Sequence, residues 1–228
     1  MKTLRVSSLC PAILFASGLV FAGVANGALV APVETTLVTY SMAVGNEFAP
    51  TSVGDGLGAS ALGVGASSAE LQAGSSLPGS VFLNPTIDSP TIAASRANGQ
   101  YFEFTVSSAF GDLFAPDGIS FSVGNGGVST PRGWAIFSSV DGFTNALASA
   151  SVSSIQPTMD LVSAPLTGFD LSAEPVTFRI YEYAPAAEQG MFFDDISVTG
   201  QVVAVPETSS FVLVAIATTA GFLRRRRH

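Results

Sequence analysis

Strict alternation of apolar and other side chains is the feature that most constrains how this chain folds. In YFEFTV, which begins at position 101, Phe102, Phe104 and Val106 share one side of an extended segment. Successive side chains of a strand point to opposite faces, so a period of two predicts a half-buried strand. The same period predicts two further inward sets, which are Ile119, Phe121 and Val123 in ISFSVG, and Val176, Phe178 and Ile180 in VTFRIYEY.

Several other stretches have strand character and are separated by turn signals. The candidates are TTLVTYSM (35–42), GWAIFSSV (133–140), ALASASVS (146–153) and FFDDISVTGQVV (192–203), with APDG, GNGG and VDGF as turns. The chain has 23 glycines and 13 prolines, and it lacks the charged residues of surface helices, since only 11% of its residues are charged. These features favour an all-β, antiparallel, jelly-roll-like β-sandwich over a parallel sheet with crossover helices.

A glycine-rich stretch separates the first strand from the others. Residues 45–80 hold few bulky side chains, too few for a core element. We expect long, loosely ordered surface loops there, with at most one short strand.

The N-terminal 27 residues have the pattern of a secretory signal peptide. Two cations, Lys2 and Arg5, precede an apolar run, and Ala25 and Gly27 supply the small residues of a cleavage site. We expect a signal helix that is recognised by the secretion translocon and cut by signal peptidase after Gly27. The only cysteine, Cys10, lies ahead of the apolar run, so the exported chain has no thiol.

The last 25 residues, 204–228, form a second export-related segment. The stretch Phe211–Leu223 contains 13 apolar or small residues, which as a helix would be about 20 Å long. A bilayer core is about 30 Å thick, so this short helix could span it only marginally, as a weak transmembrane anchor. The cluster Arg224, Arg225, Arg226 and Arg227 would stay in the cytoplasm and leave residues 28–203 outside as an extracytoplasmic domain.

The tail VPETSSFVLVAIATTAGFLRRRRH resembles the PEP-CTERM sorting signal of exported bacterial proteins. Val205, Pro206, Glu207 and Thr208 occupy its motif, although Thr208 stands where that family usually has proline. The resemblance implies an exosortase, a membrane cysteine peptidase, as partner. It also implies transient anchorage, followed by delivery to the cell envelope or the extracellular matrix. An ordinary C-terminal anchor is the alternative.

The charge between the two terminal segments is strongly negative. Sixteen carboxylates and three arginines lie between Glu34 and Asp195, and the lysine count there is zero. Such a field repels phosphates, so nucleic acid is excluded as a partner.

Most kinds of catalytic site are also excluded. The only histidine, His228, lies in the tail, so the exported domain cannot form a Ser-His-Asp triad or a His/Cys zinc site. A pair of carboxylates, as in a glycosidase, is the remaining mechanism, with Glu103 and the Asp194-Asp195 pair as candidates. Solvated acids on an outer strand face explain these residues better, and we therefore expect no enzyme activity and no catalytic residues.

The ending FFDDISVTG looks like the last strand of the jelly rolls found in carbohydrate-binding modules. With Ile196 and Val198 facing inward, Asp194 would share their side and Asp195 would face out. An inward carboxylate needs a hydrogen bond from a loop, an arginine or a hard cation. The resemblance implies structural calcium as the cation, held by Asp194 or Asp195 together with an early carboxylate such as Glu34.

Exposed aromatic residues are the candidates for binding sugar. Tyr181 and Tyr183 share the outward side of VTFRIYEY, whereas the apolar neighbours of Trp134 indicate a core residue. Three functions thus stay open: a structural or adhesive protein of the envelope or matrix, a carbohydrate-binding module for extracellular polysaccharide, and a carboxylate-dependent glycosidase. They predict, in turn, a polar sandwich surface, a groove with at least two exposed aromatic residues, and two carboxylates facing each other.

Overall fold

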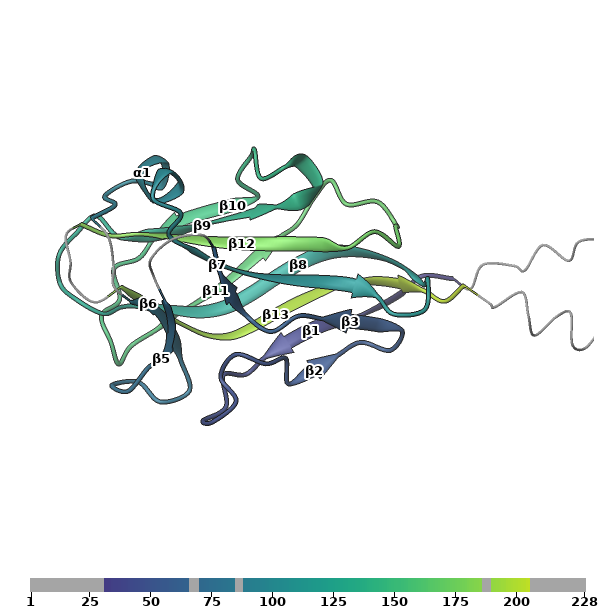
Figure 1. The fold of residues 1–228 in the computed structure, drawn as a ribbon, viewed down its shortest axis with the longest axis horizontal. Helices are drawn as coiled ribbons and strands as arrows, with labels where there is room; N and C mark the ends of the chain where they lie inside the picture. Colours follow the sequence, from purple (N-terminus) through teal and green to yellow (C-terminus); the bar gives the residue numbers. More distant parts are fainter. Residues whose placement is uncertain (1–30, 66–69, 85–87, 186–189, 206–228) are drawn as a thin grey trace, which may run out of the picture.

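The chain folds into two antiparallel sheets that pack face to face (Figure 1). The computed structural model describes residues 31–65, 70–84, 88–185 and 190–205. One sheet has seven strands in the order β11-β8-β13-β1-β2, with β6 beside β13 and β5 beside β6. The other has six, in the order β10-β9-β12-β7-β3, with β4 beside β7. The predicted jelly-roll-like β-sandwich is confirmed.

The strands of the seven-stranded sheet are β1 (Val33–Tyr40), β2 (Ser52–Val53), β5 (Glu70–Ala73), β6 (Val81–Asn84), β8 (Leu113–Asn125), β11 (Asp160–Pro165) and β13 (Met191–Val203). Those of the six-stranded sheet are β3 (Leu57–Ala59), β4 (Gly63–Val64), β7 (Tyr101–Ser108), β9 (Gly133–Ser138), β10 (Ala148–Ser151) and β12 (Val176–Tyr183). Two short helices, α1 (Ile92–Ala97) and the 3-10 turn η1 (Ser139–Asp141), complete the fold.

The core lies between the two sheets and is built from the alternating residues that the sequence identifies. Phe102 of β7 and Phe121 of β8 both contact Phe193 of β13, with ring centroids 5.0 and 5.8 Å apart. Trp134 of β9 is 3% exposed and meets Phe121 edge to face at 5.0 Å. Trp134 therefore belongs to the core, in agreement with the prediction from its neighbours.

The expectation for residues 45–80 is wrong in two respects. This stretch supplies four short strands, β2 to β5, where one at most was expected. Leu57 and Leu62 from this region are 8% and 7% exposed and join the main core. The expectation that this stretch supplies no core element is therefore wrong as well.

Both ends of the folded domain lie at the same end of the sandwich. Strands β1 and β13 run antiparallel, and Val33 pairs with Val202 (Figure 1). The expected signal helix (1–27), the motif positions from Pro206 onwards and Arg224–Arg227 lie outside the described residues. Within the described part of the chain, none of the helices has the length and apolar character needed to cross a membrane.

Candidate binding face

The outer face of the six-stranded sheet carries several of the predicted site residues. Tyr101 of β7 pairs with Tyr181 of β12, and Glu103 pairs with Arg179. These residues alternate with Phe102 and other members of the main core, so they point to the side away from the other sheet. We call this surface, from β7 across β12 to β10, the aromatic face.

An ion pair occupies the middle of the aromatic face. Arg179 Nε donates to Glu103 Oε2 at 2.8 Å, and about a third of each side chain is exposed. The guanidinium of Arg179 lies over the rings of Phe143, at 3.7 Å, and Tyr101, at 4.5 Å. Glu103 is therefore engaged in an ion pair within the sheet surface.

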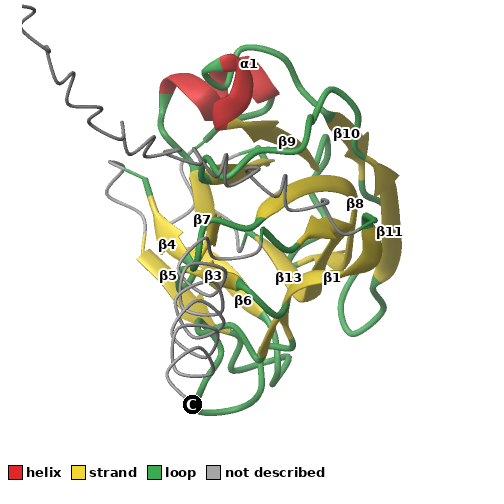
Figure 2. Ribbon diagram, turned by 90° about the vertical axis from the view of Figure 1, so that its right-hand side faces the viewer, coloured by secondary structure: helices red, strands yellow, loops and turns green. Residues whose placement is uncertain are grey.

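Tyr181 lies on the aromatic face but is not exposed. It is only 5% exposed, because Tyr101 and Phe137 pack against it at 4.8 and 5.3 Å. Helix α1 covers this part of the sheet (Figure 2), and its Arg96 reaches over the Phe137 ring at 4.5 Å. The prediction that Tyr181 forms an outward platform is thus wrong, since a helix that the sequence analysis missed buries the ring.

Tyr183, two residues further along β12, keeps part of its ring exposed. It lines a hollow of about 440 Å³ together with residues at the start of α1 and residues of β10. Its ring approaches Gly133 of β9 so closely that a β-carbon at this position would collide with it. The other lining residues are Pro90, Thr91, Ile92, Pro131, Ser149, Ala150 and Ser151. This hollow combines one aromatic ring with three hydroxyl groups.

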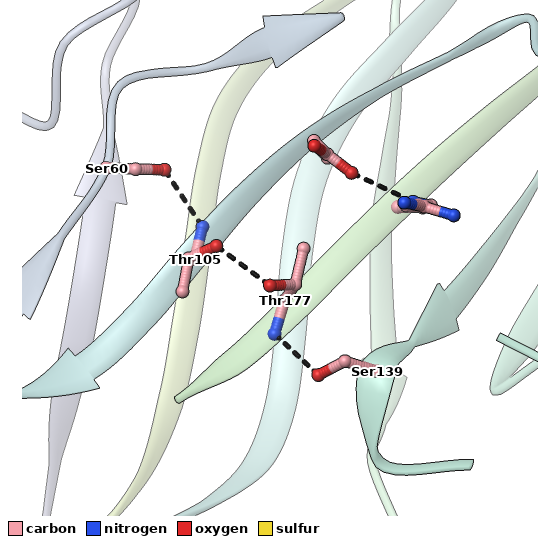
Figure 3. Close-up of polar contacts among 6 residues, drawn as sticks. Ser60, Thr105, Ser139 and Thr177 are labelled. Atoms are coloured by element: carbon pink, nitrogen blue, oxygen red, sulfur yellow. Dashed lines mark hydrogen bonds and ion pairs between the residues drawn. The ribbon is translucent and has the colours of Figure 1, made fainter. Parts of the chain in front are cut away.

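Away from the helix, the aromatic face ends in a line of hydroxyl groups (Figure 3). Thr105 and Thr177 share a hydrogen bond between their hydroxyls at 2.8 Å. The Thr105 N–H donates to Ser60 Oγ at 3.0 Å, and the Thr177 N–H donates to Ser139 Oγ at 2.9 Å. These side chains satisfy backbone groups and one another, so they form a polar surface without a reactive group.

The two aspartates of β13 lie on the opposite side of the molecule. Asp194 pairs with Ser122, and the register between β13 and β8 then shifts before Ser197. Asp195 is the extra residue of this bulge and has a left-handed backbone, with φ of 51°. The bulge breaks the alternation, so Asp194 points away from the core, and the expectation that it shares the side of Ile196 is wrong.

The bulge also fixes the environment of these carboxylates. Asp194 Oδ1 accepts the Asp195 N–H at 2.7 Å, and partial burial raises the pKa of Asp194 to about 6. Glu34 lies opposite Gln201, whose side chain donates to it at 2.6 Å. Six strand positions from Asp195 to Gln201 amount to about 20 Å, so Glu34 cannot share a cation with the aspartates. Among the residues described, three or more carboxylate, histidine or cysteine side chains do not gather anywhere as a metal-binding group.

A buried polar cluster, which the sequence analysis missed, lies at the far end of the core. Glu182 is fully buried, and it accepts hydrogen bonds from Gln100 Nε2 at 2.9 Å and from the Met191 N–H at 3.0 Å. Burial raises the pKa of Glu182 to about 7, although nearby Arg132, itself 1% exposed, acts in the opposite direction. The alternation in VTFRIYEY could have revealed this buried carboxylate, since it places Glu182 on the same inward side as Ile180.

Comparison with known proteins bears on the fold alone. No family model matches the chain, and no curated protein matches it. Solved structures similar to it include the CBM22-1 xylan-binding domain from Paenibacillus barcinonensis Xyn10C, with 11% identity over 75% of this chain and 97% of that one, and a TM-score of 0.40. A family 29 carbohydrate-binding module from Piromyces equi matches with 12% identity, 75% and 91% coverage and a TM-score of 0.38. The cleaved adhesin domain of Lys-gingipain from Porphyromonas gingivalis matches with 11% identity, 73% and 99% coverage and a TM-score of 0.40.

Proposed function

We propose that this chain is an exported protein of the bacterial envelope or extracellular matrix, and that its β-sandwich has a structural or adhesive role without catalysis. The signal peptide pattern of residues 1–27 and the PEP-CTERM-like tail from Val205 support export, exosortase processing and release from a transient membrane anchor. The character of the domain surface supports the adhesive role.

The observation that carries the adhesive role is a row of hydroxyl groups across the outer face of the seven-stranded sheet. The row crosses five strands in continuous register, and Thr39 and Ser197 within it lie 3.5 Å apart. Its members are Ser52, Thr39, Ser197, Ser120 and Ser163. A row of short hydroxyls can donate and accept hydrogen bonds along an extended partner, but it supplies no general base or nucleophile.

The arrangement of carboxylates argues against the glycosidase alternative. Glu103 lies on the outer face of one sheet and is paired with Arg179, whereas Asp194 lies on the outer face of the other. A glycosidase needs its two carboxyl groups about 5 to 10 Å apart across a shared cleft. These two point away from each other on opposite sides of the sandwich.

The sorting proposal is tested by the intact mass of the protein recovered from its native host. We expect the wild type to have lost the arginine tail, and the double variant Pro206→Ala, Glu207→Ala to keep it and stay in the membrane fraction. Thr208→Pro, which completes the usual motif, is the matched control and should be processed like the wild type. Retention of the tail by the wild type would leave an ordinary anchor as the explanation.

Carbohydrate binding remains a second candidate because of the hollow beside Tyr183. The partly exposed ring of Tyr183 and the hydroxyls of Thr91, Ser149 and Ser151 line a space of about 440 Å³, which can hold a sugar residue. Of the two aromatic residues proposed from the sequence, only Tyr183 can stack on a pyranose ring.

Affinity electrophoresis against a panel of neutral polysaccharides tests this candidate. If it is correct, one polysaccharide retards the wild type, Tyr183→Ala abolishes the retardation, and Ser75→Ala, in the exposed loop between β5 and β6, leaves it unchanged. If no polysaccharide retards the wild type, or if Tyr183→Ala binds equally well, the hollow is not a sugar site.

A further inference from the structure

The chain leaves the domain through a small, well-defined surface that we call the exit end. Strand β13 ends at Val203, opposite Leu113 of β8, and β1 begins beside it at Val33. Two steps further on, the Val205 N–H donates to Asp112 Oδ1 at 2.9 Å. Asp112 belongs to the β7–β8 loop (residues 109–112), which joins β7 of one sheet to β8 of the other, so this loop lies directly beside the departing chain.

The β7–β8 loop presents an exposed aromatic side chain. Phe110 is 75% exposed, and Val33 and Val205 beside the chain exit are 58% and 38% exposed. The Ala109 N–H donates to the carbonyl of Gly56 at 2.9 Å, which ties the β7–β8 loop to the neighbouring turn between β2 and β3. Phe110 therefore lies on a loop that is hydrogen-bonded at both Ala109 and Asp112. Phe110, Val33 and Val205 thus add three exposed apolar side chains to one end of the domain.

The length of the chain beyond the exit end limits how far this surface can lie from a membrane. Seven residues, 204–210, separate the end of β13 from the apolar segment that begins at Phe211. Even fully extended, seven residues reach only about 24 Å. While the tail is anchored, the exit end must therefore lie within about 24 Å of the point where the apolar segment enters the bilayer.

We infer that Phe110 and the apolar residues around the chain exit contact the outer surface of the lipid bilayer while the tail is anchored. This inference rests on the anchoring role in the proposed function. A phenylalanine ring that enters the boundary between the lipid headgroups and the acyl chains gains apolar burial. Asp55 and Asp112 line a hollow of about 290 Å³ at the same exit. Their charge confines the contact to the tip of the β7–β8 loop and favours zwitterionic over anionic lipids.

The test uses the full chain reconstituted into phosphatidylcholine vesicles, with single tryptophan probes. Phe110→Trp and Val33→Trp place a probe at the exit end. Val128→Trp places the control beyond the far end of β8, since Val128 is 75% exposed and the 13 residues of β8 span about 40 Å. Native Trp134 is buried in the core, so the wild type supplies the background emission. Brominated phosphatidylcholine quenches a tryptophan that touches the acyl chains.

We expect all variants to float with the vesicles, and we expect brominated lipid to reduce the emission of Phe110→Trp but not that of Val128→Trp. Removing residues from Phe211 onwards should abolish both flotation and quenching. Suppose that the proteins float, but that neither exit-end probe is quenched or that Val128→Trp is quenched equally. The proposed contact of Phe110 with the membrane is then wrong, whereas the membrane anchor is supported. If the full chain does not float, the anchor and the contact that depends on it are both wrong.

Discussion

Replacing Glu182 by glutamine should make the domain more stable at alkaline pH, although it removes a hydrogen-bonded carboxylate. Glu182 is fully buried, and its pKa rises from 4.5 to about 7 because burial disfavours the charged form. Three interactions favour the charged form, namely those with Met191, Gln100 and Arg132, but they do not offset the cost of burial.

The sign and size of the effect follow from the linkage between proton binding and folding. The raised pKa means that the folded state keeps its proton at pH values where the unfolded chain has released it. The contribution to stability is therefore complete below pH 4.5, falls as the pH rises and is lost above about pH 7. The rise of the Glu182 pKa from 4.5 to about 7 corresponds to roughly 3 kcal/mol. Glutamine does not titrate, so the variant should escape this loss.

The variant is also close in shape to the protonated glutamate. Its amide oxygen can accept the Met191 N–H, and its amide group can donate to Gln100 Oε1, which has no hydrogen-bond partner among the described residues. For that contact the amide of Gln100 needs only to turn over. The variant should therefore resemble the wild type most closely at low pH, where both side chains are neutral.

Urea unfolding of residues 28–205 at pH values from 4.5 to 8 measures this difference. Between pH 4.5 and pH 8, we expect the free energy of unfolding of Glu182→Gln to rise by about 3 kcal/mol relative to that of the wild type. Asp194→Asn is the control. The pKa of Asp194 is about 6, so the difference in free energy of unfolding between this variant and the wild type should develop at lower pH. Parallel curves for Glu182→Gln and the wild type would refute the reasoning and show that Arg132 keeps the buried carboxylate charged.

Three further substitutions test other parts of the structure. Gly56→Ala should lower the free energy of unfolding by roughly 2 kcal/mol or more, because φ is +75° and the new β-carbon would meet Asp112. Gly45→Ala is its control in the same urea titration. Its φ is +86° but the space around it is open, so it should lower the free energy of unfolding by only about 1 kcal/mol. Arg179→Met should cost about 1 kcal/mol through loss of the Glu103 pair and the ring contacts, and an unchanged thermal midpoint would contradict this role. Asp195→Gly should raise stability by up to about 1 kcal/mol because it relieves the left-handed bulge residue, whereas Asp195→Val should lower it.

The sequence predicts the strands best where alternation continues without interruption. The expected strand at 176–183 coincides with β12 because each of its residues follows the period of two. The bulge at Asp195 could not be predicted, since a single inserted residue in β13 depends on how β8 pairs with it. One extra residue reverses the alternation of inward and outward side chains beyond it. The alternation pattern alone therefore places Asp194 on the wrong face of the sheet.

The prediction for the aromatic face failed for a different reason. Alternation correctly placed Tyr181 on the outer side of β12, but it gives no information about what covers that side. Helix α1 has only six residues, begins at the capping hydroxyl of Thr91 and leaves no periodic signal of its own. Burial on an outer sheet face depends on such short segments, so exposure could not be inferred from the strand alone.

The arginines of the domain are engaged within the fold, and this limits the kinds of partner that the domain surface can bind. All three arginines of the described residues serve the fold: Arg132 is buried, Arg179 pairs with Glu103, and Arg96 Nη2 donates to the Phe143 carbonyl at 2.7 Å. Most of the carboxylates, in contrast, are exposed, including Asp55, Asp117 and Asp160. The surface thus combines negative charge with hydroxyl rows, which opposes attachment to anionic polymers. An adhesive role therefore requires a neutral or cationic partner, and raising the ionic strength should weaken binding to a cationic partner but not to a neutral one.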